Sequence, residues 1–279
     1  MIKRILVPLD ISPFAECATA YACKVAKAHA GATVTGMTVI DIPEILTTNI
    51  PVHAVLVSDW DAAAAHMQRD AAAKLATARE TFRATCERNR VAHEEFALKG
   101  APAQSILDAT FYHDLVVVGQ RTYFHFETQG HQADGQSLKD ILSSTPAPVL
   151  AVPSSPTRPL DSVLVAYDGS LNAARALRDF ATLAAPFDPE VVVLTAGADG
   201  EHAAHHLAQA QSYLEAHGFA KLTTVATKAK IIEVVESEYL PWADLIVAGI
   251  HSRRHLRDLF VGSFTKFLIG RCQTPLLLG

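Results

Sequence analysis

A glycine and hydroxyl motif near the C-terminus has the residue types and the spacing of an anion-binding loop. It reads Gly249-x2-Ser252-x9-Gly262-Ser263, and Thr265 follows shortly after. Glycine lets a ligand approach the backbone closely, and the free N–H groups at the start of a helix favour negative charge there. The motif therefore predicts a phosphate site, although a glycine that turns the chain and a serine that caps a helix would leave the same pattern.

An aspartate ends an apolar run in the same half of the chain. Residues 163–167 are apolar, and Asp168, Gly169 and Ser170 follow them. Ligands of open parallel sheets bind beyond the carboxyl ends of the strands, so residues that directly follow a buried strand are candidates for ligand contacts. The sequence places no histidine to complete a catalytic triad with Asp168 and Ser170, which disfavours a hydrolase.

The sequence patterns of several common enzyme classes are missing. No lysine follows a glycine, so there is no Walker loop, and neither a G-x-S-x-G elbow nor a G-x-G-x-x-G fingerprint occurs. These absences argue against a conventional P-loop ATPase, an esterase and a Rossmann dehydrogenase.

Two further polar clusters have simple interpretations. His202 and His206 have the spacing of metal ligands on a helix, but no third ligand accompanies them, so we interpret them as a solvated helix face and expect no metal site. Three arginines lie inside the glycine motif: Arg253, Arg254 and Arg257. They either bind phosphate oxygens or stay solvated.

The elements that would position these residues occur twice along the chain. Each copy opens with an apolar run ending on an aspartate, continues to an aspartate-led apolar run ending on glycine, and closes with a proline-led apolar run. These landmarks are residues 5–10 and 163–168, residues 113–119 and 243–249, and residues 145–152 and 273–278. Three landmarks in the same order indicate an internal duplication.

Short apolar runs alternate with amphipathic stretches in each copy, which is the pattern of parallel strands covered by helices. We therefore expect an α/β protein of two tandem five-stranded parallel-sheet units, each doubly wound and Rossmann-like. The expected strands are near residues 2–9, 32–40, 92–98, 114–119 and 148–152, and near residues 161–167, 190–196, 221–227, 244–249 and 274–278. The expected helices are near residues 13–29, 60–89, 102–111 and 136–144, and near residues 170–184, 200–217, 230–240 and 262–270.

A segment rich in proline and serine, residues 153–159, separates the two copies. We place an N-terminal domain at residues 1–153 and a C-terminal domain at residues 158–279. The fifth strand of each copy is apolar and leaves a sheet edge that must be covered, so we expect the two copies to pair near these strands.

With these motifs in place, the sequence resembles the universal stress protein family. Nucleotide-binding members of that family carry G-x2-G-x9-G-[S/T] after the fourth strand and an aspartate at the end of the first. The second copy keeps this spacing and departs from the motif only at Ser252. The fold that the resemblance implies is adenine nucleotide alpha hydrolase-like.

The resemblance also implies roles for individual residues. Asp168 would contact the ribose, and the phosphates would lie against Gly249, Gly262, Ser263 and Thr265. Ser252 adds a side chain where the family has glycine, which would weaken the binding of a triphosphate. The full set of candidate nucleotide-binding residues is Ala166, Asp168, Gly169, Ser170, Ala248, Gly249, Ser252, Arg253, Gly262, Ser263, Phe264 and Thr265.

The first copy departs further from the family pattern. It keeps Asp10 and Gly119, but Thr122 stands in place of the second glycine and Gln136 in place of the serine, and the spacing from Thr122 to Gly135 is longer. We therefore expect a degenerate nucleotide loop in the N-terminal domain, with an empty or altered pocket.

Composition limits the partners and the compartment. A formal charge of -5 and a pI near 6.2 give no excess of positive charge for nucleic acid. The 4 cysteines form no C-x-x-C pair, so we interpret them as reduced thiols and expect a cytoplasmic protein. No signal-peptide core follows the N-terminus, and no apolar run is long enough to span a membrane.

From the sequence we expect a universal stress protein that binds ATP, ADP or AMP, with or without Mg²⁺, in its C-terminal domain. It would act as a stress-response regulatory or binding module, without a catalytic residue. Two alternatives stay open: a slow ATP hydrolase that uses the same loop, and a scaffold in which both pockets are vestigial. The expected assembly is the pairing of the two domains within one chain, and a homodimer stays open.

Overall fold

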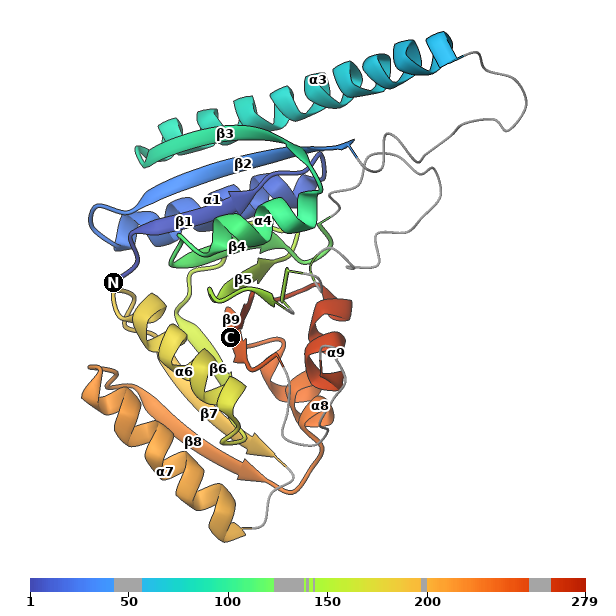
Figure 1. Cartoon of the computed structure of the whole chain (residues 1–279). Coiled ribbons are helices and arrows are strands. Elements are labelled where there is room, and N and C mark those ends of the chain that lie inside the picture. The colour runs from blue at the N-terminus through green and yellow to red at the C-terminus, as the bar shows by residue number, and fades with distance from the viewer. Residues whose placement is uncertain (43–56, 123–137, 139–140, 143, 197–199, 251–261) are drawn as a thin grey trace.

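A computed structural model describes residues 1–42, 57–122, 138, 141–142, 144–196, 200–250 and 262–279 of the chain (Figure 1). Every expected strand is present. The strands of the first half are β1 (Arg4–Pro8), β2 (Thr33–Asp41), β3 (Ala92–Gly100), β4 (Leu115–Gly119) and β5 (Val149–Val152). Those of the second half are β6 (Ser162–Ala166), β7 (Glu190–Ala196), β8 (Leu222–Thr227), β9 (Leu245–Ala248) and β10 (Leu276–Leu278).

The strands of both halves join into one sheet of 10 strands, in the order β3-β2-β1-β4-β5-β10-β9-β6-β7-β8. Neighbouring strands are parallel within each half. At the seam between the halves β5 and β10 are antiparallel, with Leu277 opposite Leu150. This pairing of the fifth strands is the one that their apolar character predicts, and it covers an edge of each half.

The helices also follow the expected order. The first half contains α1 (Pro13–Ala28), α3 (Val57–Asn89) and α4 (Pro102–Thr110). The second half contains α6 (Leu171–Ala184), α7 (Gly200–Ala216), α8 (Ile231–Val234) and α9 (Ser263–Arg271). The expected helix at 230–240 changes type along its length, because α8 continues as a π-helix over Val235–Tyr239. The expected helix at 136–144 lies largely outside the described residues.

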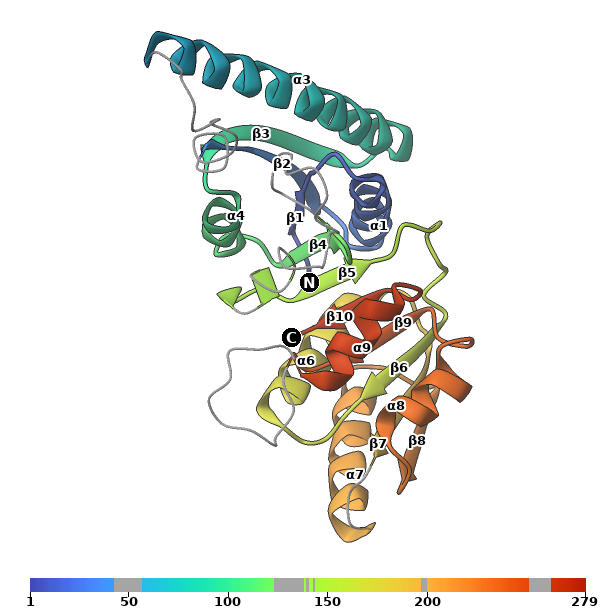
Figure 2. The same ribbon diagram turned by 90° about the vertical axis from the view of Figure 1, so that its right-hand side faces the viewer.

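Helices cover both faces of the sheet (Figure 2). α1, α3, α6 and α7 share one face, and a single buried apolar cluster beneath them runs across both halves. A second cluster on the opposite face includes side chains of α4, α8 and α9. Neighbouring strand residues alternate between the two clusters, as Val163 and Leu164 do. The core is therefore shared between the halves as well as the sheet.

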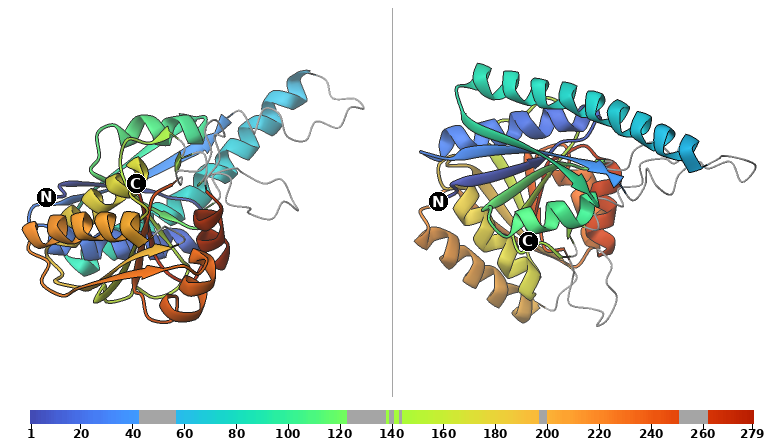
Figure 3. Two further views of the ribbon diagram at one scale, coloured as in Figure 1. Left: turned by 90° about the horizontal axis from the view of Figure 1, so that it is seen from below. Right: turned by 45° about the horizontal axis from the view of Figure 1, so that its top comes forward.

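The long helix α3 is fixed to the sheet along a narrow stripe. Its buried apolar side chains are Ala71, Leu75, Phe82 and Cys86. The ring of Phe82 packs on Gly36 of β2, where an added Cβ would come within 2.7 Å of the ring. The first turns of α3 project beyond the sheet (Figures 1 and 3). None of the described helices has the length and apolar character needed to span a bilayer.

Polar contacts hold the connection between the halves. The N–H of Arg158 donates to the hydroxyl of Tyr21 at 2.8 Å, and its guanidinium donates to the carbonyl of Ala243 at 2.8 Å. At the seam, the buried amide of Gln120 donates to the carbonyl of Ala151 in its own half at 3.2 Å and to that of Thr274 in the second half at 2.6 Å. These bonds fix how the second half is oriented on the first.

Candidate functional site

The loop after β6 places an aspartate at the carboxyl edge of the second half. Asp168 is partly exposed, and its Oδ1 accepts a hydrogen bond from the N–H of Ser170 at 2.9 Å. Ser170 is the N-cap of α6, and its Oγ accepts from the N–H of Ala173 at 3.2 Å. Gly169 between them has a φ of 70°, a left-handed conformation that favours glycine. The aspartate is therefore held by the first turn of α6.

Gly249, which follows β9, packs directly on that first turn of α6. A Cβ at Gly249 would lie 2.7 Å from the backbone nitrogen of Ala173 and 2.8 Å from the carbonyl carbon of Asn172. Only glycine fits here, because two of the three atoms nearest to an added Cβ belong to the backbone and cannot turn away. The backbone after β9 and the Asp168 loop are therefore adjacent.

The start of α9 is fixed to the same place by two hydrogen bonds. The Oγ1 of Thr265 donates to the carbonyl of Gly249 at 3.1 Å, and the N–H of Gly262 donates to the carbonyl of Ile250 at 2.9 Å. Three of the four motif positions predicted from the sequence are thus brought together with Asp168 at one edge of the sheet.

Gly262 is the N-cap of α9 and has a φ of -59°, which any residue can adopt. Because it has no side chain, it cannot cap the N–H groups of the first turn, which leaves them to water or to an anion. Ser263 is exposed, Phe264 is partly buried, and Thr265 is buried. The hydroxyl of Thr265 is already used to hold Gly249.

The remaining predicted site residues divide into two groups. Ala166 and Ala248 are the last residues of β6 and β9, so they lie at this carboxyl edge of the sheet. Ser252 and Arg253 lie outside the described residues, as do Arg254 and Arg257.

His206 on α7 is a site neighbour that the sequence analysis missed. Its ring packs on Gly169, where an added Cβ would come within 2.5 Å of Cε1, and it makes an edge contact with the ring of Tyr167. His202 and His205 are exposed, in keeping with a solvated face, but His206 is partly buried. A signal was available, because His206 directly precedes the buried Leu207 and borders the apolar stripe of α7. Among the described residues, no three His, Cys, Asp or Glu side chains are grouped so as to hold a metal ion.

The equivalent aspartate of the first half is buried. Asp10 is 4% exposed, and its Oδ1 accepts from the N–H of Ser12 at 3.0 Å and from the hydroxyl of Ser12 at 2.6 Å. Gly119 after β4 faces side chains, since its added Cβ would lie 2.3 Å from the Cβ of Phe14 and 2.8 Å from the Oγ1 of Thr122. Gly135 and Gln136 of the altered loop lie outside the described residues.

A cavity of about 550 Å³ lies beside Asp10, between α1 and α3. Its polar lining includes Ser12, Glu16, Thr77 and Thr81. In the first half, the cavity therefore lies between Asp10 and the two helices α1 and α3.

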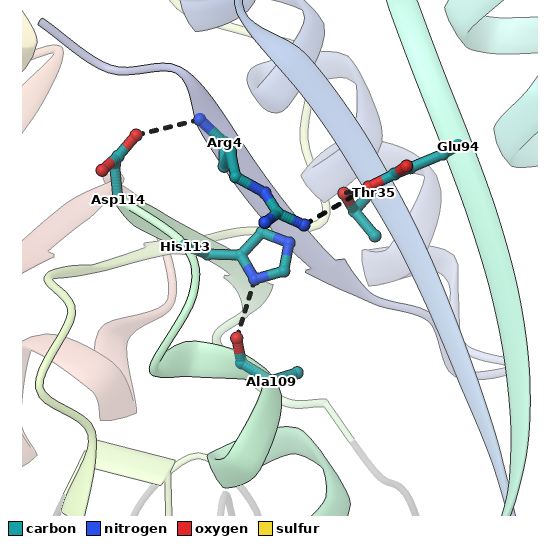
Figure 4. A network of polar contacts seen from close by, with 6 residues as sticks. All are labelled: Arg4, Thr35, Glu94, Ala109, His113 and Asp114. Carbon is teal, nitrogen blue, oxygen red and sulfur yellow. Dashed lines mark hydrogen bonds and ion pairs between the residues drawn. The ribbon is translucent and has the colours of Figure 1, made fainter.

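Asp114 and Asp244, the aspartates of the landmarks at residues 113–119 and 243–249, lie at the opposite edge of the sheet and have a structural role there. The Oδ2 of Asp114 accepts from the N–H of Lys3 at 2.8 Å and of Arg4 at 2.9 Å (Figure 4). Asp244 does the same in the second half, where its Oδ2 accepts from the N–H of Asp161 at 3.1 Å. These two aspartates cap the start of the first strand of each half, so their repetition reflects structure.

His113 lies beside this cap and has no histidine counterpart in the second half. Its Nδ1 donates to the carbonyl of Ala109 at 2.7 Å, while its ring lies near Arg4 and Glu94 (Figure 4). Burial lowers the pKa of His113 below its usual range, and the bond to Ala109 offsets only part of this effect.

The joined sheet, the helices on both faces and the candidate residues at the carboxyl ends of the strands define a tandem, doubly wound α/β protein. The model of the universal stress protein family matches residues 1–153 and 159–278, which is nearly the whole chain. The chain belongs to the universal stress protein family.

Individual relatives agree with this assignment. The universal stress protein Slr1230 of Synechocystis is 27% identical over 169 residues, which is 59% of this chain, and the match spans only 57% of that relative. A universal stress protein structure from Archaeoglobus fulgidus has a TM-score of 0.69 at 18% identity and covers 99% of this chain and 95% of its own. A putative universal stress protein structure from Pseudomonas aeruginosa has a TM-score of 0.54 at 14% identity, covering 99% of this chain and 92% of its own. At these identities the two structures establish the fold alone.

Proposed function

We propose that the second half of this universal stress protein binds an adenine nucleotide at the carboxyl edge of its sheet. The observation that carries the proposal is the contact of Gly249 with the first turn of α6. It joins the Asp168 loop to the glycine loop and, through Thr265, to the start of α9. A ligand with a hydroxyl-bearing sugar and an anionic tail would meet both parts at once.

In this arrangement the partly exposed Asp168 carboxylate accepts hydrogen bonds from ribose hydroxyls. The phosphates lie at the start of α9, where backbone N–H groups and the helix dipole favour negative charge. Gly262 leaves space for their approach, and the exposed Ser263 hydroxyl donates one more hydrogen bond. When Mg²⁺ accompanies the phosphates, the phosphate oxygens supply most of its ligands, so the protein needs few of its own.

Binding, rather than turnover, is the function that these groups support best. The described part of the site offers one carboxylate, hydroxyls and backbone N–H groups, which suit recognition. We therefore propose a regulatory module whose nucleotide occupancy is the signal, in keeping with a stress-response role.

The test is a thermal melt of the full chain with ATP, ADP and AMP, comparing the parent with Asp168→Ala and Asp10→Ala. A ligand at about 100 times its Kd stabilises the folded state by about 2.7 kcal/mol. We expect the parent and Asp10→Ala to show this shift and Asp168→Ala to lose it. Asp168→Asn is a control, since it keeps the acceptor for the Ser170 N–H and removes only the charge.

Two results would contradict the proposal. Equal loss in the Asp10 and Asp168 variants would show that binding does not depend on the second half alone. A parent chain that melts at the same temperature with and without each nucleotide would favour the scaffold alternative. Release of inorganic phosphate from Mg²⁺-ATP would instead favour the hydrolase.

A further inference from the structure

Two cysteines far apart in the sequence meet in the core of the first half. Cys23 of α1 and Cys86 of α3 are both fully buried, and their Sγ atoms are 3.7 Å apart in hydrogen-bond contact. The two helices pack on the same face of the sheet (Figure 2). The remaining cysteines, Cys17 and Cys272, are partly exposed.

We propose that Cys23 and Cys86 are a redox-modification site, at which a hydroperoxide converts the two thiols into a disulfide linking α1 to α3. A disulfide bond is about 2.05 Å long, so the sulfurs need to approach by less than 2 Å. Both residues lie inside regular helices, where a small sliding motion or a change of side-chain rotamer can supply this displacement.

The neighbouring charges favour Cys23 as the nucleophile of the pair, since Lys27 lies near Cys23 and Glu87 near Cys86. The hydrogen-bond contact with Cys86 lowers the pKa of Cys23 despite its burial, and the Lys27 ammonium acts in the same direction. Its partner behaves oppositely, because that hydrogen bond and burial raise the pKa of Cys86. Burial also raises the pKa values of Cys17 and Cys272. A thiolate is the reactive form, so the first attack falls to Cys23.

A route for a small oxidant ends close to the pair. The 550 Å³ cavity between α1 and α3 is lined by Thr19 and Phe82. Cys23 and Cys86 lie one helical turn beyond these two residues on the same helices. In this proposal the oxidant reaches the buried thiols through local openings of α3, which a narrow stripe of buried side chains holds on the sheet.

The chemistry balances with the hydroperoxide as the only added reactant. The Cys23 thiolate attacks the terminal oxygen, the O–O bond breaks, and the products are a sulfenic acid and an alcohol, or water when the oxidant is hydrogen peroxide. The Cys86 sulfur then loses its proton and attacks the Cys23 sulfur, which releases water and forms the S–S bond. Two thiols are oxidised by two electrons, and one O–O bond is reduced.

The linkage would tie α1 to α3, which wall the cavity beside Asp10. Oxidation would therefore fix the spacing of these helices and the width of that cavity. This inference does not rest on nucleotide binding, because every residue involved lies in the first half.

The experiment uses the full chain, reduced, desalted and treated with equimolar hydrogen peroxide. Thiols are then alkylated in denaturant and counted by intact mass, and peptides are mapped. We expect the alkylated thiols to fall from the 4 cysteines of the chain to two, with one peptide pair joining Cys23 to Cys86 in a monomer. The melting temperature should rise by several degrees and return when dithiothreitol is added.

Matched variants separate the pair from the other cysteines. Cys17→Ala with Cys272→Ala should keep the reaction, whereas Cys23→Ala and Cys86→Ala should each abolish it. The proposal is overturned if the parent keeps four alkylatable thiols while glutathione in the same tube is oxidised. It is equally overturned if the mapped disulfide joins another pair or two chains. Mapping of the parent decides the question even when a core variant fails to fold.

Discussion

The two halves of the molecule share one fold but present different carboxyl edges. In both, an aspartate after the first strand accepts a hydrogen bond from the N–H of the serine two residues later. In the first half Asp10 is buried, while in the second half Asp168 is partly exposed. The shared turn therefore does not decide whether the site is open; the residues around it do.

Several residues around the turn differ between the two halves. The first half has Phe14 where the second half has the smaller Asn172, and the Cβ of each lies against the glycine after the fourth strand. After the glycine, the first half has Gln120, which turns its amide into the seam. The fold gives both halves the same carboxyl edge, and the residues of the loops and first helical turns determine what that edge can bind.

The largest contrast should come from removing one buried phenylalanine in each half. Phe82→Ala and Phe180→Ala both delete a fully buried ring, and each should cost about 3–5 kcal/mol in unfolding free energy. Urea denaturation measures this cost. Because Phe180 lies on α6, which holds Asp168, only Phe180→Ala should also reduce nucleotide-induced stabilisation. If Phe82→Ala also loses the nucleotide response at a temperature where it is folded, the site is not confined to the second half and the proposal is contradicted.

The next contrast concerns the seam, where Gln120 has no polar counterpart in the second half. Gln120→Ala removes donors to the carbonyls of Ala151 and Thr274, which should cost about 1–3 kcal/mol. We expect urea unfolding to become broader, since the halves then melt with less coupling. Gln104→Ala, an exposed glutamine on α4, is the control and should have no measurable effect. An unchanged curve for Gln120→Ala would show that strand pairing alone couples the halves.

A smaller effect is expected from crowding the start of α9. Gly262→Val should weaken nucleotide binding more than tenfold, or about 1.4 kcal/mol, because the side chain fills the space where phosphate meets backbone N–H groups. Calorimetric titration measures the Kd. Gly200→Val, at an open position at the start of α7, should bind as the parent does. Ser252→Gly should bind the nucleotide as tightly as the parent or more tightly. If Gly262→Val binds it as tightly as the parent does, the loop has only a structural role as a turn.

The smallest contrast is a pH dependence specific to the first half. The folded-state pKa of His113 lies below its unfolded value near 6.5, so the unfolded chain binds more protons as the pH falls below that value. Stability should therefore decrease on acidification, by at most about 1.4 kcal/mol per pH unit for one proton. His113→Gln should flatten the slope of the unfolding free energy between pH 7 and pH 5. An identical slope in both proteins would contradict the assignment.

The sequence was sufficient for the element order, while the candidate site predicted from it stays a prediction. Strand and helix positions follow from apolar periodicity, and Gly249 and Gly262 lie at the carboxyl edge of the half that contains Asp168, as their spacing predicts. The π-helix at Val235–Tyr239 was not predicted, since a single widened turn leaves the amphipathic pattern nearly unchanged. His206 was missed because its contact with Gly169 joins elements that are distant in sequence.

The antiparallel pairing of β5 and β10 has a consequence for how such a protein can diverge. In a symmetric homodimer joined by the same strand, every substitution occurs in both sites at once. With both copies in one chain, each site accumulates changes alone while the joint between them is kept. The residues around Asp10, such as Phe14, Gln120 and Thr122, can therefore differ from their counterparts in the second half without any change at Asp168. When the two copies are joined in one chain, the two halves can become different from each other and are always present in equal amounts.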